Sequence, residues 1–291
     1  MTPTPPPIDP AWQPYPGALD PSIRLFVRRQ VLSPQLRNYR DVIVALPPSY
    51  DTTTNIYPVV YMHDGQNLFD PATAFAGHWQ LTTVLAELAV EGTEAIVVGI
   101  ANKGKHRLHE YSPFPDLIRG GGGGDRYLAF VAETLKPIID RDFRANPARA
   151  TTAIAGSSMG GLISLYGLYR FADIFGAAGV MSPSLWYAGR TILDYVDAWS
   201  TGAVGRLYLD IGLQEPKGAV ADARALRAIL EKHGPATAPE FEYFEDEGGI
   251  HNEGTWGRRF GRCLPFLVGG QRPSTIDPLP ASLEPPYIRL R

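Results

Sequence analysis

The chain has a single cysteine, Cys263, among its 291 residues. One cysteine excludes a disulfide within the chain and a cluster of thiolate metal ligands, and it is typical of proteins from a reducing compartment. No stretch approaches the roughly 20 consecutive apolar residues of a membrane-spanning helix. Residues 1–7 also lack the basic start and the apolar segment of a secretory signal. We therefore expect a cytoplasmic protein with no membrane association.

An excess of charge of one sign is also missing. The chain has 27 basic and 30 acidic residues, a formal net charge of -3, and no long run of either sign. This balance gives no electrostatic indication of binding to nucleic acid or to an anionic membrane. No two of the six histidines have the spacing of metal ligands on one helix, so we expect neither a metal nor a cofactor. A small molecule or a neutral polymer is the expected partner, and the oligomeric state stays open.

The composition is that of a folded domain with proline-rich ends. Hydrophobic residues make up 44% of the chain and aromatic residues 11%, which is enough for a sizeable core. Residues 1–21 and 270–291 are rich in proline and have no hydrophobic periodicity. We expect a single domain over residues 22–269, with an N-terminal extension and a C-terminal tail outside it.

Strand-like and helix-like segments alternate along this domain. The pattern predicts an α/β fold with a mostly parallel sheet of about eight strands and helices on both faces. The expected strands are residues 23–31, 41–46, 57–62, 95–100, 151–155, 176–181, 207–211 and 240–244, of which the first two form an antiparallel pair. The expected helices are residues 79–89, 125–140, with a kink at Pro137, a helix beginning near 162, and 219–233. The five glycines of residues 120–124 are expected to form a surface loop.

Gly156-Ser157-Ser158-Met159-Gly160 lies between the apolar strand of residues 151–155 and the helix that begins near 162. A strand, a sharp turn that carries a serine, and a helix form a nucleophile elbow. Its glycines let the backbone fold tightly enough to expose the central hydroxyl. Ser158 is therefore the candidate nucleophile for attack on a carbonyl carbon.

A serine hydroxyl needs a base, and the base needs an acid that fixes its tautomer. His251 is the preferred base because it follows the last expected strand, whereas the position of His63 suits the oxyanion loop better. In α/β-hydrolases the acid lies between the serine and the histidine in the sequence. Glu215 is favoured, because it follows the strand of residues 207–211 at the same edge of the sheet as Ser158. Three other carboxylates stay open as the acid: Asp210, Asp222 and Asp246.

The oxyanion of the reaction needs two backbone donors. One is expected from Met159, the residue after the nucleophile. The second is expected from the loop after the strand of residues 57–62, where Gly65 allows close approach of the backbone and Gln66 supplies the N–H group.

Four segments, at 61–70, 156–161, 182–186 and 251–256, occur together in this order. With them the chain resembles the esterase D-like putative esterases of the α/β-hydrolase fold, and the resemblance covers roughly residues 20–268. The family is related to enterochelin esterases, to feruloyl and acetylxylan esterases, and to mycolyltransferases. The resemblance implies a Ser158–His251 pair, with Glu215 as the acid where many relatives carry aspartate.

On this basis we expect a serine carboxylic-ester hydrolase acting on small, sugar or phenolic esters. Trp79, Trp186 and Trp256 are candidates for lining the substrate pocket, although packing in the core is an equal alternative for each. Glu110 is a further candidate contact for the alcohol moiety, with pairing at the surface as its alternative. An acyltransferase with the same residues and a non-catalytic carbohydrate-binding protein on the same fold are the competing hypotheses.

Overall fold

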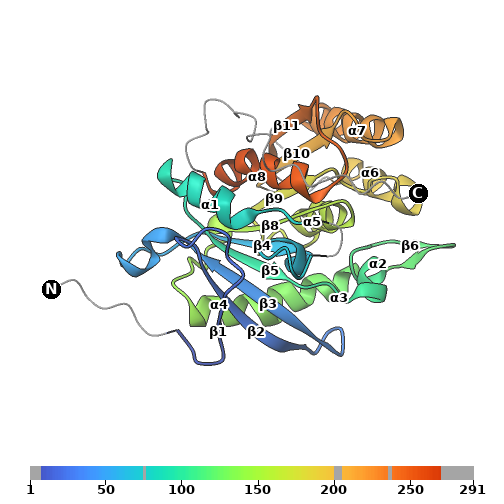
Figure 1. The fold of residues 1–291 in the computed structure, drawn as a ribbon. Helices are drawn as coiled ribbons and strands as arrows, with labels where there is room; N and C mark the ends of the chain where they lie inside the picture. The colour runs from blue at the N-terminus through green and yellow to red at the C-terminus, as the bar shows by residue number, and fades with distance from the viewer. Residues whose placement is uncertain (1–7, 75–76, 200–204, 235–237, 270–291) are drawn as a thin grey trace, which may run out of the picture.

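A computed structural model describes residues 8–74, 77–199, 205–234 and 238–269. Within these ranges one large sheet forms the centre of the molecule (Figure 1). Its nine strands are β1 (Gln13–Tyr15), β2 (Arg24–Ser33), β3 (Asn38–Leu46), β4 (Val59–His63), β5 (Ile96–Ile100), β8 (Thr152–Ser157), β9 (Ala177–Met181), β10 (Arg206–Gly212) and β11 (Glu240–Asp246). The expected C-terminal tail, residues 270–291, lies outside the described residues.

The strand order is β1-β2-β3-β5-β4-β8-β9-β10-β11. The six strands from β5 to β11 are parallel, and β1, β2 and β3 form an antiparallel edge. In β4 and β5 every residue is buried, as expected for strands that are covered on both faces. β8 lies near the middle, so the carboxyl ends of its neighbours surround the segment that follows it.

Helices cover both faces of the sheet (Figure 1). One face packs against α1 (Leu81–Val90) and α8 (Glu253–Val268). The other packs against α3 (Gly124–Ala129), α4 (Lys136–Asp142), α5 (Met159–Arg170), α6 (Thr191–Asp197) and α7 (Lys217–His233). The predicted α/β-hydrolase architecture is confirmed. None of the helices in the described ranges is both long enough and apolar enough to cross a bilayer.

Four local features differ from the expectation. Residues 13–15, which we placed in an extension outside the domain, form the edge strand β1, and the neighbouring Trp12 is 3% exposed. The helix expected over residues 125–140 contains a π-helical segment, Phe130–Leu135, and Pro137 lies in the first turn of α4 instead of kinking a last turn. Gly120–Gly121 pairs with Pro115–Asp116 in a two-stranded hairpin, β7 with β6. The sequence did not predict α6 or α8.

Candidate active site

Ser158 occupies the sharp turn between β8 and α5. Its φ of 58° and ψ of -121° place a residue with a side chain in a region that L-amino acids rarely adopt. The turn is tight because Gly156 and Gly160 both pack against His63. A Cβ atom at Gly156 would lie 2.9 Å from Cδ2 of that ring, so a larger residue does not fit there. The backbone strain at Ser158 is therefore held by close packing under the turn.

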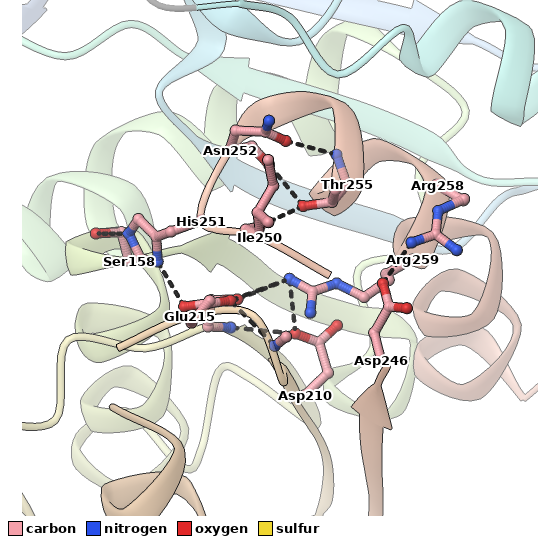
Figure 2. Close-up of polar contacts among 12 residues, drawn as sticks. Ser158, Asp210, Glu215, Asp246, Ile250, His251, Asn252, Thr255, Arg258 and Arg259 are labelled. Atoms are coloured by element: carbon pink, nitrogen blue, oxygen red, sulfur yellow. Dashed lines mark hydrogen bonds and ion pairs between the residues drawn. The ribbon is translucent and has the colours of Figure 1, made fainter. Parts of the chain in front are cut away.

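Ser158, His251 and Glu215 form a continuous chain of hydrogen bonds (Figure 2). Nε2 of His251 is 3.1 Å from Oγ of Ser158, and Nδ1 is 2.7 Å from Oε2 of Glu215. The imidazole is partly exposed, with 40% of its side-chain surface accessible, whereas the Glu215 side chain is fully buried. Three elements that are far apart in the sequence thus meet at the carboxyl edge of the sheet.

The loop that carries His251 is fixed by the start of α8 (Figure 2). The side chain of Asn252 caps the helix by accepting a hydrogen bond of 2.9 Å from the Thr255 amide. The Thr255 hydroxyl donates to the carbonyl of Ile250 at 2.5 Å. Trp256 packs edge-on against the imidazole, with ring centroids 4.8 Å apart. These contacts hold the imidazole over Ser158.

The protonation state of Glu215 determines the tautomer of His251. Burial by itself would raise the pKa of Glu215, but hydrogen bonds from His251, Ser182 and the Gly212 amide lower it below the ordinary value. An ionised carboxylate only accepts hydrogen bonds, so Nδ1 of His251 must carry the proton. Nε2 is then left with a lone pair that accepts the hydrogen of the Ser158 hydroxyl.

A buried polar network lies beneath Glu215, and sequence reasoning did not identify it (Figure 2). Arg259, which is 1% exposed, donates a hydrogen bond of 2.7 Å to the Ser182 hydroxyl, and that hydroxyl donates to Oε1 of Glu215 at 2.5 Å. Arg259 also lies 3.5 Å from Asp210. Burial raises the pKa of Asp210 to about 6, although the nearby guanidinium opposes the shift. Asp210 therefore contacts this network, and its carboxylate makes no contact with His251 in the described residues.

The other two carboxylates left open by the sequence are engaged elsewhere. Asp222 forms an ion pair of 2.6 Å with Arg190. Asp246 accepts a hydrogen bond of 2.5 Å from Arg258 on α8. Of the four candidates, only Glu215 contacts the imidazole of His251 in the described structure.

The two expected oxyanion donors lie in the first turn of a helical segment. Met159 is the first residue of α5, so the helix itself provides no acceptor for its N–H group. Gln66 lies in the 3₁₀ turn Gly65–Asn67, and its side-chain Oε1 accepts a hydrogen bond of 3.1 Å from the Asn102 amide. A Cβ atom at Gly65 would collide with the backbone of Gly99 on β5, so this turn needs a glycine there.

His63, the alternative base, is buried under the elbow. Burial lowers its pKa to about 3. Its Nδ1 is 2.7 Å from the hydroxyl of Tyr127 on α3, and it makes no contact with the Ser158 hydroxyl in the described residues. Its position is therefore that of a neutral packing residue beneath the nucleophile.

A cavity of about 740 Å³ opens beside Ser158 and His251. Trp79 and Trp256, two of the three expected tryptophans, line it and are also packed in the core, at 3% and 5% exposure, with ring centroids 5.9 Å apart. Polar groups also line the wall, among them the ion pair in which Arg107 donates two hydrogen bonds of 2.7 Å to Asp64. Glu253 also lines the cavity.

Two expected substrate contacts lie outside this cavity. Trp186 is 45% exposed, lies under the guanidinium of Arg119, and is not among the residues that line the cavity. Glu110 is 1% exposed and forms a buried ion pair of 3.0 Å with Arg40, so it is neither a substrate contact nor a surface pair. The sequence could not indicate the ion pair of Glu110, because its partner Arg40 lies 70 residues away in the chain. No group of three or more potential metal ligands occurs in the residues that the structure describes.

A mostly parallel sheet with a serine elbow after a central strand and a histidine after the last strand defines an α/β-hydrolase. The chain belongs to the esterase family whose model is described as "Putative esterase", which matches residues 33–267. The resemblance found in the sequence is thereby confirmed.

Three individual proteins that are similar to this chain share 20–30% of its residues over the aligned regions. The chain is 26% identical over 255 residues to the uncharacterized protein YbbA of Bacillus subtilis (strain 168), which covers 83% of this chain and 97% of that protein. It is 30% identical over 149 residues to the siderophore triacetylfusarinine C esterase of Aspergillus fumigatus, covering 49% of each. Among solved structures, the BES protein from Bacillus cereus shares the fold with a TM-score of 0.67 at 20% identity, over 92% of this chain and 98% of that one.

Proposed function

We propose that the chain is a serine carboxylic-ester hydrolase that forms an acyl-enzyme on Ser158. The observation that carries the proposal is the hydrogen-bonded chain from Ser158 through His251 to Glu215 at the edge of a cavity. The proton is transferred from Ser158 to His251, because an ionised Glu215 leaves the lone pair of Nε2 facing the serine hydroxyl. Membership of the esterase family supports the same reaction.

In the first half of the reaction, His251 takes the proton of Ser158 while Oγ forms a bond to the ester carbonyl carbon. The electron pair of the carbonyl double bond moves onto oxygen, and the N–H groups of Met159 and Gln66 stabilise that oxyanion. The carbonyl then re-forms, the bond to the alcohol breaks, and His251 returns the proton to the leaving alcohol. In the second half, His251 takes a proton from water while the water oxygen attacks the carbonyl carbon of the acyl-enzyme. The bond to Oγ then breaks, His251 returns the proton to Oγ, and the acid is released.

The substrate we propose is a small ester whose acyl or alcohol part is aromatic or rich in hydroxyl groups. A volume of about 740 Å³ suits such a molecule, and Trp79 and Trp256 offer aromatic surface for it. Asp64, Arg107 and Glu253 offer polar contacts. The siderophore esterase among the relatives supports testing siderophore esters beside sugar and phenolic esters.

The test compares wild type with Ser158→Ala on p-nitrophenyl acyl esters, feruloyl and acetylated sugars, and siderophore esters. We expect the variant to lose at least about 10⁴-fold in kcat, because the oxyanion donors and binding alone leave only residual catalysis. A fluorophosphonate should label Ser158 in the wild type and leave the variant unlabelled. Ser164→Ala is the matched control, since this serine is buried in α5 with its hydroxyl bonded to the Gly160 carbonyl. Retained turnover in Ser158→Ala would refute the proposal.

A further inference from the structure

A second hydroxyl contacts the nucleophile. Oγ of Ser184 lies 3.2 Å from Oγ of Ser158, within hydrogen-bond distance. Ser184 belongs to the loop that follows β9, the strand next to β8, and it is 4% exposed. The sequence motif at residues 182–186 contributed to the family resemblance, but no role followed from it for this serine.

The backbone holds this contact in place from both sides. The amide of Ser184 donates a hydrogen bond of 3.0 Å to the carbonyl of Ser158, and the amide of Ser158 donates one of 3.1 Å to the carbonyl of Met181. At the other end of the loop, the amide of Ser182 donates to the side chain of Asp210 at 3.1 Å. The backbones of Ser158 and Ser184 are therefore held next to each other, within reach of a contact between their hydroxyls.

The number of available hydrogens sets the direction of the bond between the two serines. A serine hydroxyl has one hydrogen to donate and two lone pairs that accept. Ionised Glu215 fixes the proton of His251 on Nδ1, so Nε2 accepts the single hydrogen of Ser158. Ser158 then has no hydrogen left for Ser184. The hydroxyl of Ser184 must donate, and the lone pair of Ser158 must accept.

We propose that Ser184 is a further catalytic residue, whose hydroxyl stabilises the negative charge that develops on Oγ of Ser158. The inference rests on the proposed function above. As the Oγ–H bond of Ser158 breaks and its proton moves to His251, the electron pair stays on Oγ until the bond to the carbonyl carbon has formed. A hydrogen bond to an anionic oxygen is stronger than one to a neutral hydroxyl, so the donor stabilises the transition state more than the ground state.

The same donor acts again in the second half of the reaction. In the acyl-enzyme Oγ is an ester oxygen, which is a weak acceptor. When water has added and the bond between the carbonyl carbon and Oγ breaks, the electron pair returns to Oγ and the hydroxyl of Ser184 again has a strong acceptor. His251 then returns the proton to Oγ. Both formation and hydrolysis of the acyl-enzyme are therefore expected to depend on Ser184.

The experiment compares Ser184→Ala and Ser184→Thr with wild type, and Ser164→Ala serves as the control for loss of a buried hydroxyl. We expect Ser184→Ala to lower kcat by roughly 10- to 100-fold with little change in KM, as for loss of a hydrogen bond to a charged group. The rate of fluorophosphonate labelling should fall by a similar factor, because labelling needs the same nucleophile and no ester substrate. Ser184→Thr, which keeps the hydroxyl, should restore most of both rates.

Thermal unfolding of the same variants separates a chemical role from a packing role. Unchanged kcat and labelling rates in Ser184→Ala would overturn the inference. So would a loss of activity that follows a lowered unfolding temperature and that threonine does not reverse. If Ser158→Ala is inactive while Ser184→Ala is normal, the role of Ser184 fails and the proposed function stands. If Ser158→Ala is active, the proposed function itself fails.

Discussion

Glu215 uses its two carboxylate oxygens for different tasks. Oε2 accepts a hydrogen bond from the Nδ1–H group of His251, while Oε1 accepts hydrogen bonds from the Ser182 hydroxyl and from the Gly212 amide at 3.0 Å. The side chain reaches the imidazole from the turn after β10 because its own backbone folds back, with the Glu215 amide bonded to the Gly212 carbonyl. The fold of this turn therefore lets a glutamate side chain reach the imidazole of His251.

We predict that Glu215→Gln lowers kcat by about 10²- to 10⁴-fold with little change in KM. The amide is nearly isosteric, but its NH₂ group can donate to Nδ1 and so favour the tautomer that carries hydrogen on Nε2. That tautomer cannot accept the proton of Ser158. Steady-state kinetics on a p-nitrophenyl ester measure the effect.

Asp222→Asn is the matched control for this prediction, because its carboxylate pairs with Arg190 and lies away from His251 in the described structure. It should keep kcat within about 2-fold of wild type, as expected of a site outside the reaction. Equal activity of Glu215→Gln and wild type would show that the carboxylate is not needed to orient the imidazole.

The sequence predicted the site residues that follow strands, but it did not predict the contacts of residues whose partners lie far away in the chain. Ser158, Glu215 and His251 each come directly after a parallel strand or its turn, so their proximity could be predicted from topology. Arg259 lies on a helix that the sequence did not predict, and its partners are 44 residues or more away in the chain. Glu110 was misjudged for the same reason, because charge next to a loop does not tell a buried ion pair from a surface one.

At the scale of elements, β4, β8 and α3 meet at one buried side chain. His63 ends β4, packs against the glycines of the elbow after β8, and has Nδ1 2.7 Å from the Tyr127 hydroxyl on α3. Burial lowers its pKa to about 3, compared with an ordinary value of 6.5. The folded protein therefore binds fewer protons at this site than the unfolded chain does between those two pH values.

We predict that this histidine makes the fold sensitive to acid. Below pH 6.5 the histidine is protonated in the unfolded chain but stays neutral in the folded protein. The free energy of unfolding therefore decreases as pH falls below 6.5. In His63→Gln, the slope of the unfolding free energy between pH 4.5 and 6 should be smaller by about 1.2 kcal/mol per pH unit. Urea unfolding at several pH values measures this slope.

Asp210 changes the stability with pH in the opposite direction. Burial raises its folded pKa to about 6, so its contribution to stability grows as pH falls through the same range. Both wild type and His63→Gln contain Asp210, and its contribution cancels in the difference between them. Identical slopes for the two proteins would show that His63 is protonated in the folded state.

For the whole molecule, the alternation of apolar segments was sufficient to predict the architecture. All eight expected strands occur, and the mostly parallel order follows from the helices between them. The ninth, β1, was not predictable because residues 13–15 are too short for alternation and are surrounded by prolines. The position of β1 depends on the neighbouring Trp12. Its Nε1 donates a hydrogen bond of 2.9 Å to Asp142, and its ring packs edge-on against Phe143 with ring centroids 5.0 Å apart.

We predict that Trp12→Ala lowers the free energy of unfolding by about 3 kcal/mol, as for loss of a buried tryptophan. The activity of the folded protein should stay within 2-fold of wild type, because β1 lies five strand positions from β8, roughly 24 Å across the sheet. Trp12→Phe keeps a ring against Phe143 but loses the hydrogen bond to Asp142, so it should cost about 1 kcal/mol. Urea unfolding and ester hydrolysis at 25 °C measure the two effects separately. If Trp12→Ala leaves the free energy of unfolding unchanged, residues 8–21 do not stabilise the domain and belong to the N-terminal extension expected from the sequence.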